Sequence, residues 1–282
     1  MSQTIKKAVI TAAGYGTRLL PATKNVPKEM LPILNKPMIH YVVEQFLDAG
    51  IKDIIIVVDE GSLAVKEYFQ IDQHLVEHLK RKNKLDYLKD IQKLCDSIHF
   101  TFINQDKTLP YGNARPIYSA KEYLQDEPFI YKYGDDIMFG GRTGIVELIE
   151  HYKKCPSDIV LTGTRVEPQD MTKFGMIRFE NGSQTAVQSV VEKPKPEEID
   201  SDIASVSSYI FTPKIFEHLE PGRVIPPAEF FIQDAINVLI RKGTVTACVS
   251  RGKFLTNGDV PSYLEMIIEE ALLREDTREE FF

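Results

Sequence analysis

Two segments of the chain carry residues that could hold and transfer a phosphorylated substrate. In the first, A-A-G-Y-G-T-R follows a short apolar run and places Gly14 and Gly16 ahead of Arg18. Glycines let successive backbone N–H groups approach a polyphosphate closely, and an arginine presents a planar fork to phosphate oxygens. Lys28 adds a second fixed positive charge. The spacing fits neither G-x-x-x-x-G-K-[ST] nor G-x-G-x-x-G, so a P-loop NTPase and a dinucleotide dehydrogenase both lose support, while a purely structural G-x-G turn stays open.

The second segment, Y-K-Y-G-D-D-I-M at residues 131–138, ends an expected strand on two aspartates. Open α/β sheets bind ligands at the carboxyl ends of their strands, and a carboxylate such as Asp135 suits Mg²⁺ shared with nucleotide phosphates. A turn with solvated aspartates explains the same residues equally well. Gly-Asp-Asp is also similar to the Asp-x-Asp of glycosyltransferases, which makes those enzymes the main catalytic rival.

The elements that must position these residues alternate between strand-like and helix-like patterns. A helix is expected over 37–49, because it opens on a proline, repeats apolar residues at helical spacing and stops at Gly50. A polar-rich stretch over 72–95 suits a surface helix or a helical hairpin. Strands are expected at residues 8–12, 54–58, 99–103, 129–133 and 159–162. This βαβ rhythm predicts an α/β fold with a Rossmann-like, mostly parallel central sheet flanked by helices.

The second half of the chain is looser and richer in short strands, expected at residues 176–179, 189–191 and 208–211 around a turn at Asn181-Gly182. Amphipathic helices are expected at 229–242 and 261–274. No linker rich in Pro, Gly or Ser divides the chain, so the prediction is one domain over 1–282.

Composition excludes several classes of partner. With 282 residues, 43% of them hydrophobic and 27% charged, the chain can close a large core. Its net charge of −7 argues against non-specific binding to nucleic acid or to anionic membranes. No apolar run approaches the ~20 residues of a membrane span, and three widely spaced cysteines without a C-x-x-C pair predict a reduced, cytoplasmic protein.

A longer pattern narrows the assignment. Residues 14–32 read G-x-G-T-R-x-x-P-x-T-x-x-x-P-K-x-x-L-P, which closely resembles the opening of the sugar-1-phosphate nucleotidylyltransferases. Within that superfamily, P-A-T-K-x-x-P-K-E-M-L-P followed by K-P-M-I-H-Y-V-V is most similar to the bacterial UTP–glucose-1-phosphate uridylyltransferases. The helical stretch near 72–95 also resembles that subgroup, and shorter thymidylyltransferase relatives usually lack it. The resemblance covers nearly the whole chain.

The resemblance implies a fold of the nucleotide-diphospho-sugar transferase type. It implies a nucleotide-binding half at about 1–140, a small β-rich sugar-binding part at about 141–255 and a C-terminal helix at about 259–280. Asp135 would bind Mg²⁺, the implied cofactor, and the role of Asp136 stays open. The implied catalytic residues are Arg18, Lys28 and Lys193. The implied nucleotide-binding residues are Ala13, Gly14, Gly16, Thr17, Gln105 and Gly112. The implied sugar-binding residues are Gly175, Glu192 and Lys193.

The chain departs from the family pattern at two places. In P-Y-G-N-A, which resembles the base-binding stretch of the family, Asn113 replaces the usual histidine. Where many relatives carry a second metal-binding aspartate, this chain has Thr256, with Asp259 three residues later. A hydroxyl is a poorer Mg²⁺ ligand than a carboxylate. We expect Asp259 to cap the final helix, although a metal role for it or for Thr256 stays open.

The activity implied by the resemblance is transfer of uridylyl from UTP to glucose 1-phosphate, giving UDP-glucose and pyrophosphate by direct, Mg²⁺-assisted in-line displacement. Two alternatives stay open: thymidylyl transfer from dTTP, and a non-catalytic nucleotide-sugar sensor on the same fold. The expected partners are UTP and glucose 1-phosphate, with no nucleic acid or membrane. A homo-oligomer, either a dimer or a tetramer, is also expected. An apolar stripe of Tyr263, Met266, Ile267 and Leu272 predicts either core packing or an oligomer contact.

Overall fold

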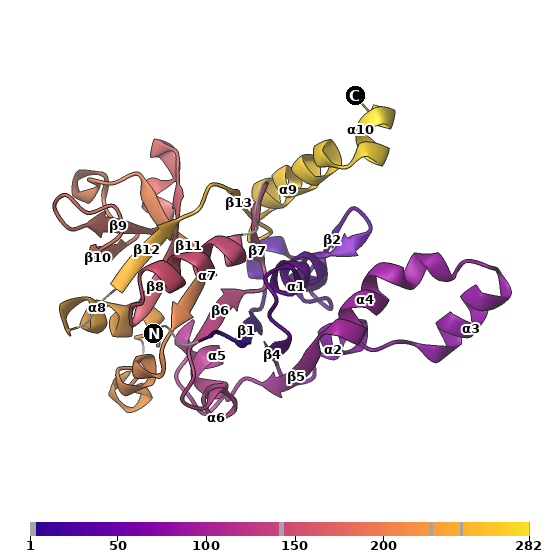
Figure 1. The fold of residues 1–282 in the computed structure, drawn as a ribbon, viewed down its shortest axis with the longest axis horizontal. Helices are drawn as coiled ribbons and strands as arrows, with labels where there is room; N and C mark the ends of the chain where they lie inside the picture. The colour runs from indigo at the N-terminus through magenta and orange to yellow at the C-terminus, as the bar shows by residue number, and fades with distance from the viewer. Residues whose placement is uncertain (1–3, 141–143, 226–227, 243–244, 282) are drawn as a thin grey trace.

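The computed structural model describes residues 4–140, 144–225, 228–242 and 245–281, built around one mixed sheet (Figure 1). Its parallel part runs in the order β6-β1-β4-β5. These strands are β1 (Lys7–Ala12), β4 (Asp53–Val58), β5 (His99–Asn104) and β6 (Phe129–Tyr133). Their carboxyl ends share one edge, so the segments that follow β1 and β6 emerge side by side. The predicted parallel, Rossmann-like core is confirmed.

The second half adds antiparallel strands to the same sheet. β11 (Ile203–Phe211) runs antiparallel to β6, β8 and β9, and thereby joins the two halves. The other strands of this half are β8 (Ile159–Arg165), β9 (Gly175–Phe179), β10 (Val187–Glu192) and β12 (Val245–Val249). β11 is longer than the expected 208–211, and β12, which pairs in parallel with β8, was not predicted.

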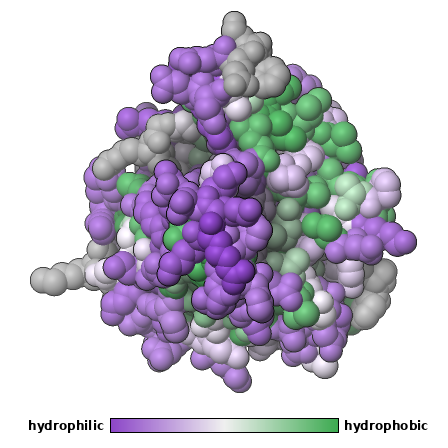
Figure 2. All heavy atoms as spheres, turned by 90° about the vertical axis from the view of Figure 1, so that its right-hand side faces the viewer, coloured by the Kyte–Doolittle hydropathy of each residue, from purple (hydrophilic) through white to green (hydrophobic). Residues whose placement is uncertain are grey.

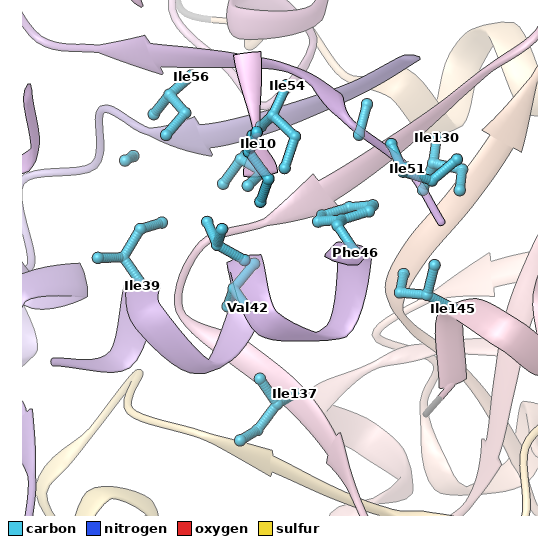
Figure 3. Packing of buried hydrophobic residues seen from close by; sticks show 14 of the residues in the cluster. Ile10, Ile39, Val42, Phe46, Ile51, Ile54, Ile56, Ile130, Ile137 and Ile145 are labelled. Atoms are coloured by element: carbon cyan, nitrogen blue, oxygen red, sulfur yellow. The ribbon is translucent and has the colours of Figure 1, made fainter. Parts of the chain in front are cut away.

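Helices cover both faces of the sheet. Successive residues of each strand point to opposite sides, so the apolar strands present hydrophobic side chains on both faces. Ile10 faces the helix α1 (Met38–Asp48), whereas its neighbour Val9 belongs to the core on the other face. Figure 3 shows Val42 and Phe46 of α1 pointing toward the sheet, with Ile137 on the opposite side of the helix. α7 (Gly144–Lys154) packs on the same face as α1. The opposite face is covered by α5 (Ala114–Ser119), α6 (Lys121–Leu124) and α8 (Ile232–Lys242).

Two helical segments project from this body (Figure 1). After α2 (Ala64–Tyr68), α3 (Gln73–Arg81) and α4 (Lys89–Ser97) form a helical hairpin, one of the two arrangements expected from the sequence. The expected C-terminal helix over 259–280 is two helices, α9 (Val260–Leu273) and α10 (Glu275–Phe281), because Arg274 adopts an extended conformation. No helix within the described ranges is long and apolar enough to cross a membrane.

Two small antiparallel pairs brace the edge where the strands end. β7 (Asp136–Phe139) pairs with β13 (Lys253–Thr256), and β2 (Pro32–Ile33) pairs with β3 (Lys36–Pro37). The first pair was not predicted from the sequence, and it brings the segment before α9 against the end of β6. Short 3-10 turns complete the chain at Thr17–Leu19, Lys28–Met30, Leu85–Leu88, Pro168–Lys173, Pro196–Glu198, Pro213–Glu217 and Pro221–Arg223.

Candidate active site

The glycine loop leaves the end of β1 and turns back on itself at Gly16, which has φ 60°. A side chain is strained in that region, and a Cβ here would lie 3.2 Å from Thr23 Cγ2. Thr23 Oγ1 donates to the carbonyl of Gly16 at 2.8 Å and fixes the turn. A Cβ on Gly14 would lie 3.4 Å from Lys28 Cε. The loop backbone therefore passes directly beside the predicted catalytic lysine.

Lys28 and Asp135 come together as an ion pair across the sheet edge. Burial lowers the pKa of the Lys28 ammonium, but the nearby carboxylates of Asp135 and Glu29 outweigh it and raise the pKa above its usual value. The lysine therefore stays charged beside the loop. A carboxylate and an ammonium held together in this way suit a site that receives both a cation and phosphate.

The position of Asp135 depends on a glycine before it. The N–H of Gly134 donates to the carbonyl of Thr11 at 2.9 Å, and a Cβ on Gly134 would lie 2.8 Å from that oxygen. A larger residue would push β6 away from β1. Thr256 Oγ1 donates to the backbone carbonyl of Asp135 at 2.9 Å. Thr256 thus positions the Asp135 backbone from β13.

Asp136 lies on the opposite side of the turn from Asp135 and is buried among polar groups. Lys132 Nζ donates to Asp136 Oδ1 at 3.3 Å and to Ser207 Oγ at 2.6 Å. Burial raises the pKa of Asp136 to about 6, against the effect of the Lys132 ammonium. Asp136 therefore belongs to an internal network that ties β6, β7 and β11 together, and we propose a structural role for it.

A cleft of about 1310 Å³ lies between the two halves of the chain. Its lining includes Arg18, Asp135, Lys173, Lys193, Thr256 and Asp259. The other lining cations, Arg165, Lys173, Arg251 and Lys253, each lie within 4.0 Å of a carboxylate. Within the described ranges, Arg18 and Lys193 have no such partner. The cleft therefore offers two unpaired cations from opposite halves, with the Lys28–Asp135 pair beside them.

Lys193 and the predicted sugar-binding residues lie where β9 begins and β10 ends. Gly175 and Glu192 face each other in the antiparallel register, and a Cβ on Gly175 would lie 2.9 Å from Glu192 Oε2. Burial raises the pKa of Glu192 above its usual value, against the effect of the Lys193 charge. Lys193 has φ 44°, a conformation that few non-glycine residues adopt, and its N–H donates to the carbonyl of Phe174 at 3.0 Å. A carboxylate beside a bare backbone can accept from sugar hydroxyls.

The two predicted base-binding residues, Gln105 and Gly112, contact different parts of the protein. Gln105 lies at the loop, where its Nε2 donates to Asp59 Oδ1 at 2.9 Å and to the carbonyl of Ala13 at 3.4 Å. Gly112 has φ 147°, and a Cβ there would lie 2.1 Å from the carbonyl oxygen of Phe230. That glycine is required for packing, whatever it does toward a base. Neither Gln105 nor Gly112 belongs to the lining of the cleft.

Asn113, which departs from the family pattern, uses its side-chain amide for hydrogen bonds within the protein. Its Oδ1 accepts from the N–H of Ile232 at 2.8 Å, and its Nδ2 donates to Tyr133 Oη at 3.4 Å. The residue thereby fixes the start of α8. Asp259, in contrast, does what the sequence predicted: it caps α9 and accepts from the N–H of Ser262 at 2.9 Å.

Two site residues escaped sequence reasoning. Asn257 Nδ2 donates to the carbonyl of Lys28 at 2.7 Å, and its N–H donates to the carbonyl of Asp135 at 2.9 Å, so that it ties the ion pair together. Glu29 is fully buried, burial raises its pKa to about 7, and its Oε2 has no hydrogen-bond partner among the described residues. Only the pairing of β13 with β7 brings Asn257 here. Glu29 stands inside the motif P-K-E-M-L-P, but nothing in that motif indicates that its carboxyl is buried.

The described residues contain no cluster of three or more His, Cys, Asp or Glu that could hold a metal ion. Asp135 is the carboxylate that the cleft offers beside the glycine loop, and its side chain is 18% exposed. One carboxylate completed by phosphate oxygens and water fits Mg²⁺, which keeps several waters and binds proteins through one or two carboxylates.

Comparison with known proteins gives a consistent result. Residues 7–271 match the family described as nucleotidyl transferase. The chain is 34% identical to a UTP–glucose-1-phosphate uridylyltransferase of Bacillus subtilis over 279 residues, which is 98% of this chain and 94% of the relative. It is 37% identical to the Pseudomonas aeruginosa enzyme of that name over 268 residues, which is 93% of this chain and 94% of the relative.

Solved structures agree with the sequence relatives. An apo UDP-glucose pyrophosphorylase superimposes with a TM-score of 0.86 at 30% identity, covering 95% of this chain and 98% of the other. A UTP-bound UGPase from Acinetobacter baumannii superimposes with a TM-score of 0.89 at 27% identity, covering 99% of this chain and 97% of the other. The architecture predicted from the sequence is thereby confirmed.

Proposed function

The chain belongs to the nucleotidyl transferase family, and from this premise we propose that it transfers a uridylyl group from UTP to glucose 1-phosphate, giving UDP-glucose and pyrophosphate. The observation that carries the proposal is the pair of unpaired cations, Arg18 and Lys193, on the two walls of the cleft that contains Asp135. The relatives' names, and solved relatives described with UTP and with UDP-glucose, support the same substrates.

The reaction asks the protein for positioning and charge neutralisation. An oxygen of the glucose 1-phosphate phosphate attacks the α-phosphorus of UTP, the bond to the bridging α–β oxygen breaks, and its electron pair leaves with pyrophosphate. The attacking oxygen is already anionic, so no side chain has to remove a proton. This explains why the cleft needs fixed charges where a hydrolase would need a base.

Each charged residue has a distinct place in this scheme. Arg18 binds the triphosphate and stabilises the charge that grows on the departing pyrophosphate, and Lys28 neutralises the phosphates beside the glycine loop. Lys193 holds the phosphate of the sugar, while Glu192 and the backbone at Gly175 accept and donate to sugar hydroxyls. Ala13, Gly14, Gly16, Thr17, Gln105 and Gly112 form the proposed nucleotide side.

The proposed cofactor is Mg²⁺, held by Asp135. When bound, the ion supplies positive charge that offsets the phosphate oxygens of the nucleotide. Lys28 already pairs with Asp135, so the carboxylate is oriented before substrates arrive. Thr256 Oγ1 and Asp259 Oδ1 already bond to backbone groups, which supports Asp135 as the protein's carboxylate for the ion.

Pyrophosphate release tests the function. We expect release from UTP together with glucose 1-phosphate, and none from either substrate alone. Clear binding of UDP-glucose without release would favour the sensor, and faster release from dTTP than from UTP would favour thymidylyl transfer. The same assay, run with both nucleotides side by side, therefore separates all three functions.

The remaining expectations are proposals of the same kind. We propose that 1–140 carry the nucleotide and 141–255 the sugar within one domain. We propose a cytoplasmic location, which agrees with three cysteines that are all free: Cys95, Cys155 and Cys248. We propose a homo-oligomer, either a dimer or a tetramer, whose mass in solution is measured by light scattering.

A further inference from the structure

Asp59 and Gln105 lie side by side at the edge of the sheet where the parallel strands end. β4 and β5 pair in parallel with Val58 opposite Asn104, so the residues that follow them leave the sheet together. The N–H of Gln105 donates to the carbonyl of Val58 at 2.9 Å and fixes this arrangement. The glycine loop leaves the same edge, where open α/β sheets bind their ligands. Both side chains are therefore close to the proposed nucleotide side.

The amide nitrogen of Gln105 is fully used by the protein. Gln105 Nε2 donates to Asp59 Oδ1 at 2.9 Å and to the carbonyl of Ala13 at 3.4 Å. A carboxylate and a carbonyl only accept, so the amide has to turn both of its N–H groups toward them. Lys107 Nζ lies 3.3 Å from the same Asp59 oxygen, and this ion pair holds the carboxylate in place. The neighbours of the amide thus decide its direction.

The amide oxygen of Gln105 is left over. Among the described residues it receives no hydrogen bond. It is also not enclosed, because the enclosed side-chain oxygens without a partner belong to Glu29, Gln45, Ser62 and Asn257. Gln105 therefore offers an acceptor and no donor to a base that lies beside the glycine loop.

We propose that Asp59 is a positioning residue that sets the base preference, because it holds the Gln105 amide with its oxygen toward the N3–H of a pyrimidine imide. The inference rests on the proposed function, in which Gln105 lies on the nucleotide side. Uracil and thymine carry a donor at N3, whereas cytosine has a lone pair there. A fixed acceptor binds the first two bases and rejects the third, because an unpaired lone pair would face another. This contact does not decide between UTP and dTTP.

Calorimetric titration with UTP and with CTP, in Mg²⁺ and without glucose 1-phosphate, tests this role. The wild type should bind UTP at least about tenfold more tightly than CTP. Asp59→Asn keeps the shape of the side chain but can donate to Gln105 Oε1, so the glutamine amide can reverse. In this variant the ratio of the UTP and CTP affinities should fall by about tenfold. A merely structural defect would weaken the binding of both nucleotides alike.

Two controls separate base recognition from a change of charge. The matched control is Glu60→Gln, because Glu60 lies 3.6 Å from the same Lys107 ammonium and its side chain is 73% exposed. The remote control is Glu77→Gln in the hydrophilic α3–α4 hairpin, which stands in front in Figure 2. Each control removes one negative charge, as Asp59→Asn does. Both should keep the affinity ratio of the wild type.

A double variant shows whether Asp59 acts through the glutamine. Gln105→Ala alone should lose the preference for UTP, and addition of Asp59→Asn should change the ratio by less than about twofold. No preference in the wild type, an unchanged ratio in Asp59→Asn, or a further fall in the double variant would overturn the proposal. If the ratios behave as expected but the wild type releases no pyrophosphate, the proposed function fails and the role of Asp59 stands.

Discussion

Replacement of Lys193 by alanine tests whether this lysine binds the phosphate of glucose 1-phosphate in the cleft. The ammonium has no carboxylate within 4.0 Å among the described residues, so its removal leaves no ion pair broken and the fold is expected to survive. Its backbone has φ 44°, which alanine tolerates about as well as lysine, since neither is glycine. Any loss of activity therefore reports on substrate.

The size of the loss follows from the contact that disappears. A charge-assisted bond to a phosphate that is carried through the transition state is worth about 2–4 kcal/mol, which corresponds to roughly 30- to 1000-fold in kcat/KM for glucose 1-phosphate. The affinity for UTP, measured without sugar phosphate, should change by less than about three-fold. Lys193→Arg should recover part of the activity, because it keeps the charge.

Steady-state kinetics with glucose 1-phosphate as the varied substrate measure this effect. Lys173→Ala is the matched control, since Lys173 lines the same cleft but already pairs with Asp170 at 2.6 Å. We expect that control to stay within a few-fold of wild type. Unchanged sugar-phosphate kinetics for Lys193→Ala, or a loss that appears only in UTP binding, would refute the assignment.

Four further variants test the nucleotide side, the metal assignment and the buried carboxyl beside the ion pair. Arg18→Ala should lower turnover by at least ~10² with an unchanged thermal transition, because an exposed loop arginine adds little to stability; loss of both would indicate a structural role. Asp135→Asn should lower turnover by at least ~10² at saturating Mg²⁺, whereas Asp259→Asn should cost about 1 kcal/mol of stability and leave turnover within a few-fold; the reverse result would refute the metal assignment. Burial raises the pKa of Glu29 from its ordinary value of 4.5 to about 7. The free energy of unfolding therefore falls as the pH rises from 4.5 to about 7, because the unfolded chain ionises this carboxyl first. Glu29→Gln should therefore gain up to about 3 kcal/mol over wild type between pH 4.5 and pH 8 in urea unfolding, and a pH-independent difference would contradict this.

Local patterns predicted most of the parallel half correctly. Ile54 to Val58 is uninterrupted Ile and Val, which suits a strand covered on both faces, and β4 has that burial. Pro37 precedes α1 and Gly50 follows it with φ 79°, as the sequence indicated. In such cases the residue type fixes the backbone, so no distant contact is needed.

The sequence could not predict what depends on distant pairing. Asp135 and Asp136 are adjacent and identical, yet one faces the cleft and the other a buried lysine, because Lys132 lies on the inner side of β6. Asn257 reaches the ion pair only through the pairing of β13 with β7. Arg274 interrupts the C-terminal helix without any glycine or proline to signal it.

Exchange of labelled pyrophosphate into UTP tests the central claim most directly. A single in-line displacement has no covalent intermediate, so UTP can be remade from pyrophosphate only through UDP-glucose. We predict that the enzyme incorporates label into UTP when glucose 1-phosphate is present and incorporates none when it is omitted. Label incorporated without glucose 1-phosphate would reveal a uridylylated protein, and no incorporation under either condition would contradict uridylyl transfer in this cleft.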